Sequence, residues 1–258
     1  QNAHELEENE KKYLPCNGSK SKAIILAASQ GNLGAITNDT PKTLLKVKGK
    51  TILSSQIAKL KKVGINQITV VRGFKKDKIK NSSLITIDND NYEHTGELYS
   101  LYCARDSLKG KIIVSYGDII YRSYILNDLI NDNNDITIIA EADFNPEGVK
   151  KDFIQTDKPY SKLLMGSPVK LHKISNTLTT SEICGEFIGL FKANINGTKI
   201  IKNTMNSLSK QSGFSEMTLI DLFNQIILKH PIAVKFIKGS WLDIDTVADL
   251  QKANNSLC

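Results

Sequence analysis

The hydrophobic residues of this chain fall into short continuous runs separated by stretches with helical spacing. Apolar runs of the length of one buried strand occupy 22–28, 67–73, 84–88, 111–118 and 135–142, and a shorter one occupies 44–47. Apolar positions three and four residues apart predict helices over 52–64, 96–108 and 124–132. A strand followed by a helix, repeated in this way, is typical of a sheet with parallel strands.

The pattern changes in the second half of the chain. Short polar segments between 145 and 186 predict hairpins, and helical spacing returns over 192–208 and 216–229. A strand over 232–238 and a last helix over 246–254 follow. The whole pattern predicts an α/β fold with a mostly parallel, Rossmann-like mixed sheet and helices on both of its faces.

The first residues differ from the rest of the chain. Residues 3–14 have helical spacing, and the sequence CNGSKS over 16–21 is typical of a linker. We therefore expect an N-terminal helix and linker over 1–21, followed by a single domain over 22–258. The chain begins with Gln rather than Met, which suggests a piece excised from a longer protein.

The composition narrows the classes of partner. No run approaches the roughly 18 consecutive apolar residues of a membrane span, so we expect no membrane partner. The four cysteines are far apart and form no CxxC pair, which favours reduced, cytoplasmic thiols over a zinc site. The net charge of +7 comes almost entirely from dispersed lysines, with three arginines. This distribution argues against nucleic acid and favours a small polyanionic substrate.

The loop from Ala27 to Lys42 is the first candidate for chemistry. Ligands of open parallel sheets bind at the carboxyl ends of the strands, where this loop begins. Small residues allow backbone N–H groups to approach phosphate oxygens, and Lys42 after Pro41 would add a positive charge. The alternative is an ordinary surface loop followed by a solvated lysine.

A carboxylate stands at the end of another predicted strand. Asp118 in IIVSYGDIIY follows the apolar run over 111–117 and is expected at the same edge of the sheet. Mg²⁺ takes one or two protein carboxylates together with phosphate oxygens. Asp118 is therefore a candidate metal ligand, with capping of the following helix as the alternative.

Several motifs together resemble those of one family. KAIILAA over 22–28, TNDTPKTLLKVKGKTIL over 37–53 and WLDIDTVADL over 241–250 resemble the nucleotidyltransferases that make nucleotide-activated sugars and alcohols. The resemblance spans nearly all of residues 22–256. It implies that the nucleotide is bound by Leu26, Ala27, Ala28, Ser29 and Gly31, and that Lys42 is the catalytic, phosphate-binding lysine.

The loop departs from the family pattern in three ways. Ser29 replaces the usual first glycine, the loop is one residue short, and the family's loop arginine is absent. Leu33 and Gly34 stand where that arginine would fall. These departures either weaken the case for the family's mechanism or mark a subfamily in which another cation contacts the triphosphate.

The resemblance also implies the metal site. By the match to the closing motif, Asp243 pairs with Asp118 as a ligand of Mg²⁺, and Asp245 is the second choice. The alternative is that Asp245 or Thr246 caps the last helix.

Two further segments bear on the nucleotide. VVRGFKKDKI over 70–79 resembles a family turn in which Gly73 lies near the base. NDNYEHTGELYSLYCA over 89–104 resembles the phosphocholine cytidylyltransferases, which implies CTP as the donor and places Ser100 beside the nucleotide.

The acceptor is suggested by the first fifteen residues. QNAHELEENEKKYLP resembles the last helix and tail of phosphoenolpyruvate mutase, which occurs fused to nucleotidyltransferase domains. That resemblance implies a phosphonate acceptor, most simply 2-aminoethylphosphonate, and a phosphoenolpyruvate mutase as fused or associated partner. The ammonium group would need a carboxylate or an aromatic face, for which we expect Glu186, Tyr160 and Trp241. Asp157, Lys158, Ser161 and Asp221 are better explained as ordinary surface residues.

The sequence thus predicts a cytoplasmic, Mg²⁺-dependent cytidylyltransferase. The alternatives are a phosphocholine cytidylyltransferase, a sugar-1-phosphate nucleotidyltransferase and a nucleotide-binding domain without catalysis.

Overall fold

The computed structural model describes residues 21–31, 33–145, 151–161 and 168–256. The helix predicted over 3–14 and all but the last residue of the N-terminal part predicted over 1–21 lie outside these residues.

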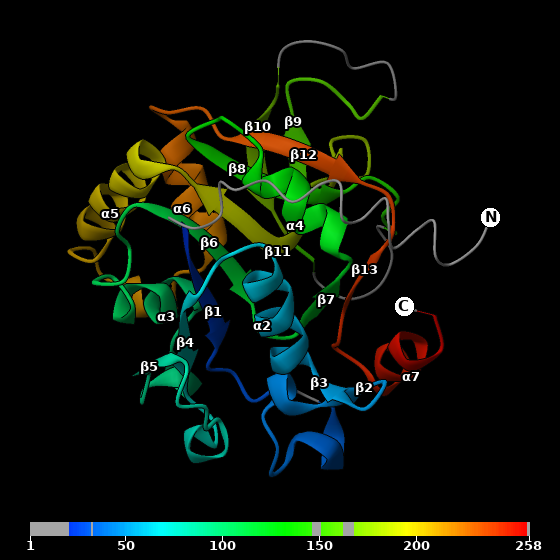
Figure 1. Ribbon diagram of the computed structural model, residues 1–258. Helices are drawn as coiled ribbons and strands as arrows, with labels where there is room; N and C mark the ends of the chain where they lie inside the picture. The colour runs from blue at the N-terminus through cyan, green and yellow to red at the C-terminus, as the bar shows by residue number, and fades with distance from the viewer. Residues whose placement is uncertain (1–20, 32, 146–150, 162–167, 257–258) are drawn as a thin grey trace.

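Nine strands of the described residues form one sheet in the order β5-β4-β1-β6-β11-β8-β12-β10-β9 (Figure 1). Their bounds are Ser21–Ala27 (β1), Gln67–Arg72 (β4), Ile85–Asp88 (β5), Lys111–Tyr116 (β6), Ile136–Glu141 (β8), Phe153–Thr156 (β9), Val169–Ser175 (β10), Gly185–Ala193 (β11) and Ala233–Ile237 (β12). The pairings β1–β4, β1–β6, β4–β5 and β8–β12 are parallel, whereas β10 and β11 are antiparallel to each strand beside them. The predicted mostly parallel, mixed sheet is confirmed.

Helices cover both faces of this sheet, as predicted. One face carries α2 (Ile52–Lys62) and α4 (Ser123–Ile130), and the other carries α3 (Glu97–Cys103), α5 (Ile195–Leu208) and α6 (Leu219–Ile227) (Figure 1). Successive side chains of a strand point to opposite faces. In β1, Ile25 therefore packs in the cluster that contains α2 and α4, while Ile24 packs with α3, α5 and α6. Burial of such alternate residues supplies most of the driving force for this layered arrangement.

Three predicted helix boundaries are wrong, and capping explains two of them. The helix predicted over 192–208 begins at Ile195, because Lys192 and Ala193 continue β11 and the Asn194 side chain accepts a hydrogen bond from Gly197 N. The helix predicted over 216–229 begins at Leu219, after a capping box between Thr218 and Asp221. The helix predicted over 96–108 ends at Cys103, where turns follow.

A smaller cluster lies at one edge of the molecule. Helix α7 (Val247–Ser256) packs beside the hairpin of β2 (Lys46–Val47) and β3 (Lys50–Thr51) (Figure 1). Ala253 of α7 packs with Leu33 in a buried hydrophobic cluster. This packing of Ala253 against Leu33 holds α7 against the loop between Ala27 and Lys42.

Short 3-10 helices span Gly34–Thr37 (η2), Lys42–Leu44 (η3), Lys76–Lys78 (η4), Tyr92–His94 (η5) and Phe214–Glu216 (η6).

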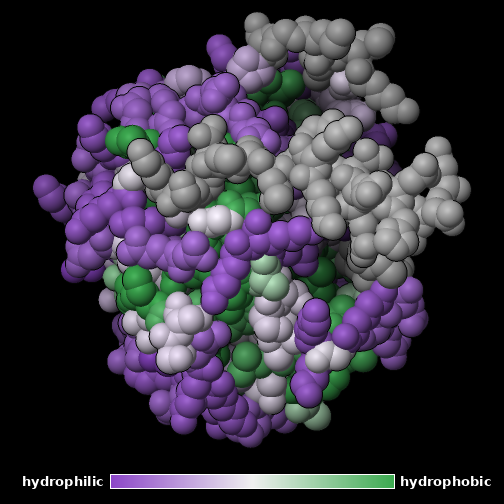
Figure 2. Space-filling view, in the orientation of Figure 1, coloured by the Kyte–Doolittle hydropathy of each residue, from purple (hydrophilic) through white to green (hydrophobic). Residues whose placement is uncertain are grey.

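The described surface is largely hydrophilic on the face seen in Figure 2. Its large exposed hydrophobic residues lie on separate elements: Ile36, Ile85, Tyr124, Ile195, Leu228 and Val247. Among the described residues, no helix has the length and apolar character needed to cross a membrane.

Candidate active site

Three carboxylates meet where two short strands pair. Asp118 lies two residues after the end of β6 and directly precedes β7 (Ile119–Tyr121), which pairs antiparallel with β13 (Trp241–Asp243). Because Asp243 lies opposite Ile119 in this register, it is brought beside Asp118, and Asp245 follows two residues later. One oxygen from each carboxylate lies within 4.8 Å of the others. The structure thus brings together the three aspartates predicted from distant parts of the sequence.

Lys42 lies among these carboxylates. Its Nζ is 2.9 Å from Asp118 Oδ2 and donates a hydrogen bond of 2.7 Å to Asp245 Oδ1, and the residue is 6% exposed. Burial disfavours its charged form, but the neighbouring Asp118 and Asp243 carboxylates prevail and raise the pKa of Lys42 above its usual value. Lys42 is therefore a fixed positive charge at the carboxyl edge of the sheet.

Asp243 is the carboxylate least satisfied by the protein. Burial, followed by repulsion from Asp118 and Asp245, raises the pKa of Asp243 to about 9. Its Oδ1 is buried and has no hydrogen-bond partner within the described parts of the chain. A divalent cation would satisfy this oxygen and relieve the repulsion, and carboxylate oxygens are the ligands that Mg²⁺ prefers. The residues present therefore fit a divalent metal. Lys42 contacts both Asp118 and Asp245, so the preference for Asp118 and Asp243 as the pair of ligands still rests on the match to the closing motif.

Thr246, rather than Asp245, caps helix α7. Thr246 N donates to Asp249 Oδ2 at 2.8 Å, and Asp249 N donates to Thr246 Oγ1 at 3.1 Å. This reciprocal capping box begins α7 and leaves Asp245 for Lys42.

A cavity of about 270 Å³ adjoins the aspartates on the side of β1. Of the predicted nucleotide-binding residues, Leu26, Ala28, Ser29, Lys42 and Ser100 line it. Ala27 instead packs in the cluster on the opposite face, because it alternates with Leu26 and Ala28 along β1. The lining also includes residues that the sequence did not single out for binding, namely Tyr92, Thr95, Gly96, Glu97 and Tyr116.

Two predicted glycines are required by close approach rather than by direct lining. Gly31 has φ +75°, and a Cβ there would lie 2.1 Å from Lys42 Cδ. A Cβ on Gly73 would lie 2.5 Å from the carbonyl oxygen of Ala28. These glycines allow the loop to fold over Lys42 and the end of β4 to approach the end of β1.

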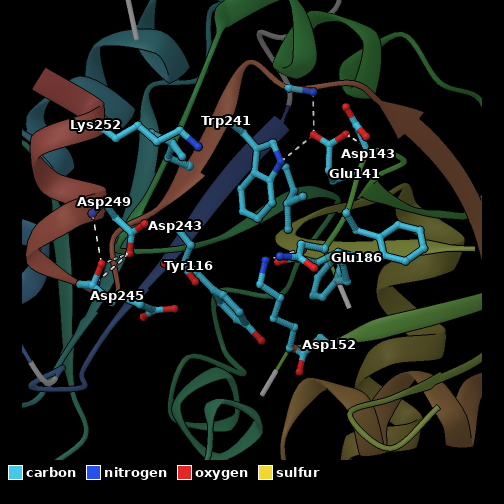
Figure 3. Close-up of a pocket in the computed structure, with 18 residues that line it drawn as sticks. Tyr116, Glu141, Asp143, Asp152, Glu186, Trp241, Asp243, Asp245, Asp249 and Lys252 are labelled. Atoms are coloured by element: carbon cyan, nitrogen blue, oxygen red, sulfur yellow. Dashed lines mark hydrogen bonds and ion pairs between the residues drawn. The ribbon is translucent and has the colours of Figure 1, made fainter. Parts of the chain in front are cut away.

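A larger cavity of about 620 Å³ shares Tyr116, Asp243 and Asp245 with the first (Figure 3). Glu186 and Trp241, two of the three residues that the sequence predicted to bind the acceptor, line it. The sequence missed four further carboxylates in its lining, which are Glu141, Asp143, Asp152 and Asp249. Glu141 and Asp143 follow the same rule that identified Asp118, since they stand at the end of an apolar strand. Asp152 precedes a short strand, and no local signal marks it.

The predicted Glu186 already has a cationic partner. Its Oε2 lies 2.7 Å from Lys151 Nζ. Burial raises the pKa of Glu186, although Lys151 opposes that shift. Glu186 therefore offers little uncompensated negative charge to an acceptor.

Asp152 is a better candidate for that charge. Burial raises the pKa of Asp152 to about 6, and the neighbouring Glu97 and Glu186 add to the effect. A cationic group bound in the cavity would favour its ionised form. Figure 3 shows Asp152 near Glu186, at the end of the cavity away from α7.

Tyr160 is not among the residues that line either cavity in the described part of the chain. Its ring packs against Phe236 at a centroid distance of 5.7 Å, with Lys238 Nζ 5.0 Å from the ring centroid. Asp157 and Asp221 accept hydrogen bonds from backbone N–H groups of Lys170 and Thr218. These contacts give Tyr160 a packing role and the two aspartates structural ones.

Glu141 holds the turn that leads into β13. The residue is 4% exposed, and its Oε2 accepts hydrogen bonds from Gly239 N at 2.7 Å and Trp241 Nε1 at 2.9 Å (Figure 3). Its Oε1 accepts from Asp143 N at 2.8 Å. Because the same turn leads to Asp243, Glu141 positions both the larger cavity and the aspartate cluster.

Glu141→Gln is expected to lower the free energy of unfolding by about 1–3 kcal/mol, because the new amide N–H₂ must face one of three N–H donors. Urea denaturation followed by Trp241 fluorescence measures this change. Glu216→Gln, at an exposed position, is the matched control. Equal stability of Glu141→Gln and the wild type would show that these hydrogen bonds do not hold the turn.

Comparison of the sequence with known proteins identifies a family and several relatives. The model of the MobA-like NTP transferase domain family matches residues 23–162. A CTP:phosphoglutamine cytidylyltransferase from Campylobacter jejuni is 30% identical over 249 residues, which cover 89% of this chain and 97% of that protein. A choline-phosphate cytidylyltransferase from Streptococcus pneumoniae is 33% identical over 113 residues, covering 42% of this chain and 49% of that protein.

Solved structures show the same fold. A CTP:phosphocholine cytidylyltransferase from Streptococcus pneumoniae has a TM-score of 0.73 at 23% identity, covering 93% of this chain and 100% of that chain. An inositol-1-phosphate CTP transferase from T. maritima has a TM-score of 0.71 at 18% identity, covering 94% and 99% respectively.

Proposed function

Because the chain belongs to the MobA-like NTP transferase domain family and is a nucleotidyltransferase, we propose that it transfers CMP from CTP to a small amino-bearing phosphonate, 2-aminoethylphosphonate, and releases pyrophosphate. The observation that carries the proposal is that Asp152, which has no ion-pair partner among the described residues, lines the larger cavity together with Asp243 and Asp245 of the aspartate cluster. A phosphorus acid at the aspartates and an ammonium group at Asp152 would span that cavity.

The donor assignment rests on the smaller cavity and on the relatives. The cavity is lined by the small residues at the end of β1 and by Lys42, which suits a nucleoside triphosphate. The Campylobacter jejuni and Streptococcus pneumoniae relatives are named for CTP-dependent reactions, which supports CTP for this chain. Lys42, Asp118 and Asp243 are accordingly proposed as the phosphate-binding and metal-binding residues.

The proposed reaction needs no protein nucleophile. A phosphonate oxygen attacks the α-phosphorus of CTP, the new P–O bond forms as the bond to the β-phosphate oxygen breaks, and pyrophosphate leaves. Lys42 would contact the phosphate oxygens and compensate their charge. A divalent ion held by Asp118 and Asp243 would supply further charge neutralisation at the α-phosphate. The described residues thus act by positioning and by electrostatics.

The acceptor assignment rests on charge. Carboxylates predominate in the larger cavity, and Lys151 compensates Glu186, which leaves Asp152 for a cationic group. The phosphonate itself is supported by the resemblance of residues 1–15 to phosphoenolpyruvate mutase. Phosphoglutamine is a second candidate, because the phosphoglutamine-specific relative aligns over 97% of its length and this amino acid also carries an ammonium group.

Asp152→Asn is expected to raise the KM for 2-aminoethylphosphonate by about 10- to 100-fold, because a charge-assisted hydrogen bond to the ammonium group is lost. The KM for CTP should change by less than about twofold. Steady-state pyrophosphate release measures both constants, and Asp106→Asn at an exposed position is the control. An unchanged KM for the acceptor would contradict the role of Asp152.

The same assignment predicts a pH dependence. Since the pKa of Asp152 is raised to about 6, the carboxyl group is protonated below that pH and ionised above it. The kcat/KM for the acceptor should therefore fall as the pH drops through about 6. Ionisation of the acceptor affects wild type and Asp152→Asn alike, so only the difference between the two profiles reports Asp152. Parallel profiles would assign the pH dependence to another group.

A further inference from the structure

The loop that would cradle the phosphates carries no basic side chain. Between Ala27 and Pro41 the sequence contains no lysine, arginine or histidine. A triphosphate carries several negative charges, and backbone N–H groups provide only partial charges. Positive side chains from elsewhere in the fold must therefore complete the phosphate site.

Within the described residues, three lysines and no arginine line the two cavities, and the three lie at different places. Lys42 lies at the centre of the aspartate cluster. Lys151 lies next to Asp152 in the sequence and contacts Glu186, at the end assigned to the acceptor. Lys252 lines the larger cavity from α7, together with Asp245 and Asp249.

The packing of α7 against the loop fixes where Lys252 lies. Ala253, the next residue, packs with Leu33 of the loop and with Ile244 in one buried cluster. The capping box at Thr246 and Asp249 fixes the first turn of the same helix. Figure 3 shows the Lys252 side chain extending from α7 into the cavity, on the side of Asp243 and Asp245 and away from Asp152.

The lysines of the neighbouring hairpin are placed less favourably. Lys46, Lys48 and Lys50 are exposed on β2, β3 and the turn between them, and none of them lines either cavity. The helix rather than the hairpin therefore supplies the second lysine on the loop side of the site.

We propose that Lys252 binds the β- and γ-phosphate oxygens of the nucleotide and, after transfer, the released pyrophosphate. The inference rests on the proposed function. It assumes that the triphosphate of CTP extends from the smaller cavity past Asp243 and Asp245, which both cavities share, to the part of the larger cavity that Lys252 lines. Lys252 and Lys42 then contact the triphosphate from two sides, α7 and η3. The two lysines then differ in function. The phosphates that Lys252 binds leave as pyrophosphate, whereas the α-phosphate remains beside Lys42.

The test compares Lys252→Ala with Lys252→Arg and with Lys46→Ala, a matched loss of one lysine on the exposed hairpin. Calorimetric titration with CTP and Mg²⁺, without acceptor, gives the Kd for CTP, and product inhibition gives the Ki for pyrophosphate. We expect both constants to rise about tenfold in Lys252→Ala, the size of one lost charge-assisted hydrogen bond. Lys252→Arg should restore most of the affinity, and Lys46→Ala should match the wild type.

The acceptor arm separates the possible failures. The KM for 2-aminoethylphosphonate should stay within about twofold in Lys252→Ala; a rise confined to that constant would instead place Lys252 at the acceptor and overturn the inference. Wild-type affinity for CTP and pyrophosphate in Lys252→Ala would overturn it as well, while the proposed function would stand. A wild-type protein that binds no CTP would overturn the proposed function and this inference with it.

Discussion

Replacement of Asp118 by asparagine is expected to reduce pyrophosphate release from CTP by about 10³-fold or more. Asp118 and Asp243 are the proposed ligand pair for a divalent metal, which would supply several kcal/mol of stabilisation to the charge that develops on the α-phosphate. An amide retains one oxygen donor but loses the negative charge that attracts the cation. The rate is measured at saturating Mg²⁺ and CTP, with Asp128→Asn on the exposed face of α4 as the control.

The same assay distinguishes the ligands within the cluster. Asp243→Asn should lose activity to the same extent as Asp118→Asn, because the buried Oδ1 of Asp243 has no hydrogen-bond partner among the described residues and would be open to a cation. Asp245→Asn should lose less, since the Asp245 side chain is 47% exposed, against 20% for Asp118, and its charge is therefore better screened by solvent. Near-normal turnover of Asp243→Asn together with an inactive Asp245→Asn would shift the assignment of the second ligand by two residues.

Replacement of Lys42 by methionine is expected to lower kcat by about 10²–10³-fold, the usual effect of removing one preorganised charge from a transition state. Methionine has a similar length and an apolar side chain, so the packing beneath Gly31 is retained while the charge is lost. Single-turnover formation of the nucleotide conjugate at saturating substrates measures the change. A Lys42→Met enzyme with a wild-type rate would show that Lys42 only balances the aspartates.

Loss of Lys42 should also lower the stability of the fold, and measuring that loss is the control for the change in kcat. Without the ammonium group, Asp118, Asp243 and Asp245 face one another uncompensated, so Lys42→Met should be less stable than the wild type. Added Mg²⁺ should restore more stability to the variant than to the wild type. Thermal unfolding with and without Mg²⁺ therefore separates a loss of folding from a loss of catalysis.

The donor side of the site could be predicted from the sequence because its residues stand at strand ends. β1 and β6 are continuous apolar runs, and their parallel pairing places Ser29 and Asp118 at a shared edge of the sheet. Lys42 lies on η3 and was predicted from its motif. Asp243 was found through its motif, and its partner strand β7 was too short to recognise by pattern. The fold class followed from the same alternation of runs and helices.

The acceptor side could not be predicted in the same way, since it depends on pairings between distant segments. β9 pairs with both β10 and β11, and the pairing of Phe153 with Glu186 brings Asp152 to the cavity. Nothing in the local sequence reveals that Lys151 compensates Glu186. Tyr160 was predicted from its chemistry alone, and its contact with Phe236 is a matter of tertiary packing.

One reaction tests the central proposal most directly: the full chain is incubated with CTP, Mg²⁺ and 2-aminoethylphosphonate, with phosphocholine and phosphoglutamine in parallel. Pyrophosphate is quantified, and the nucleotide product is identified by its mass. We predict that pyrophosphate and CMP–2-aminoethylphosphonate form in equal amounts, at the highest rate among the three acceptors. Absence of pyrophosphate with every acceptor, from a protein that binds CTP, would contradict the proposed transfer of CMP.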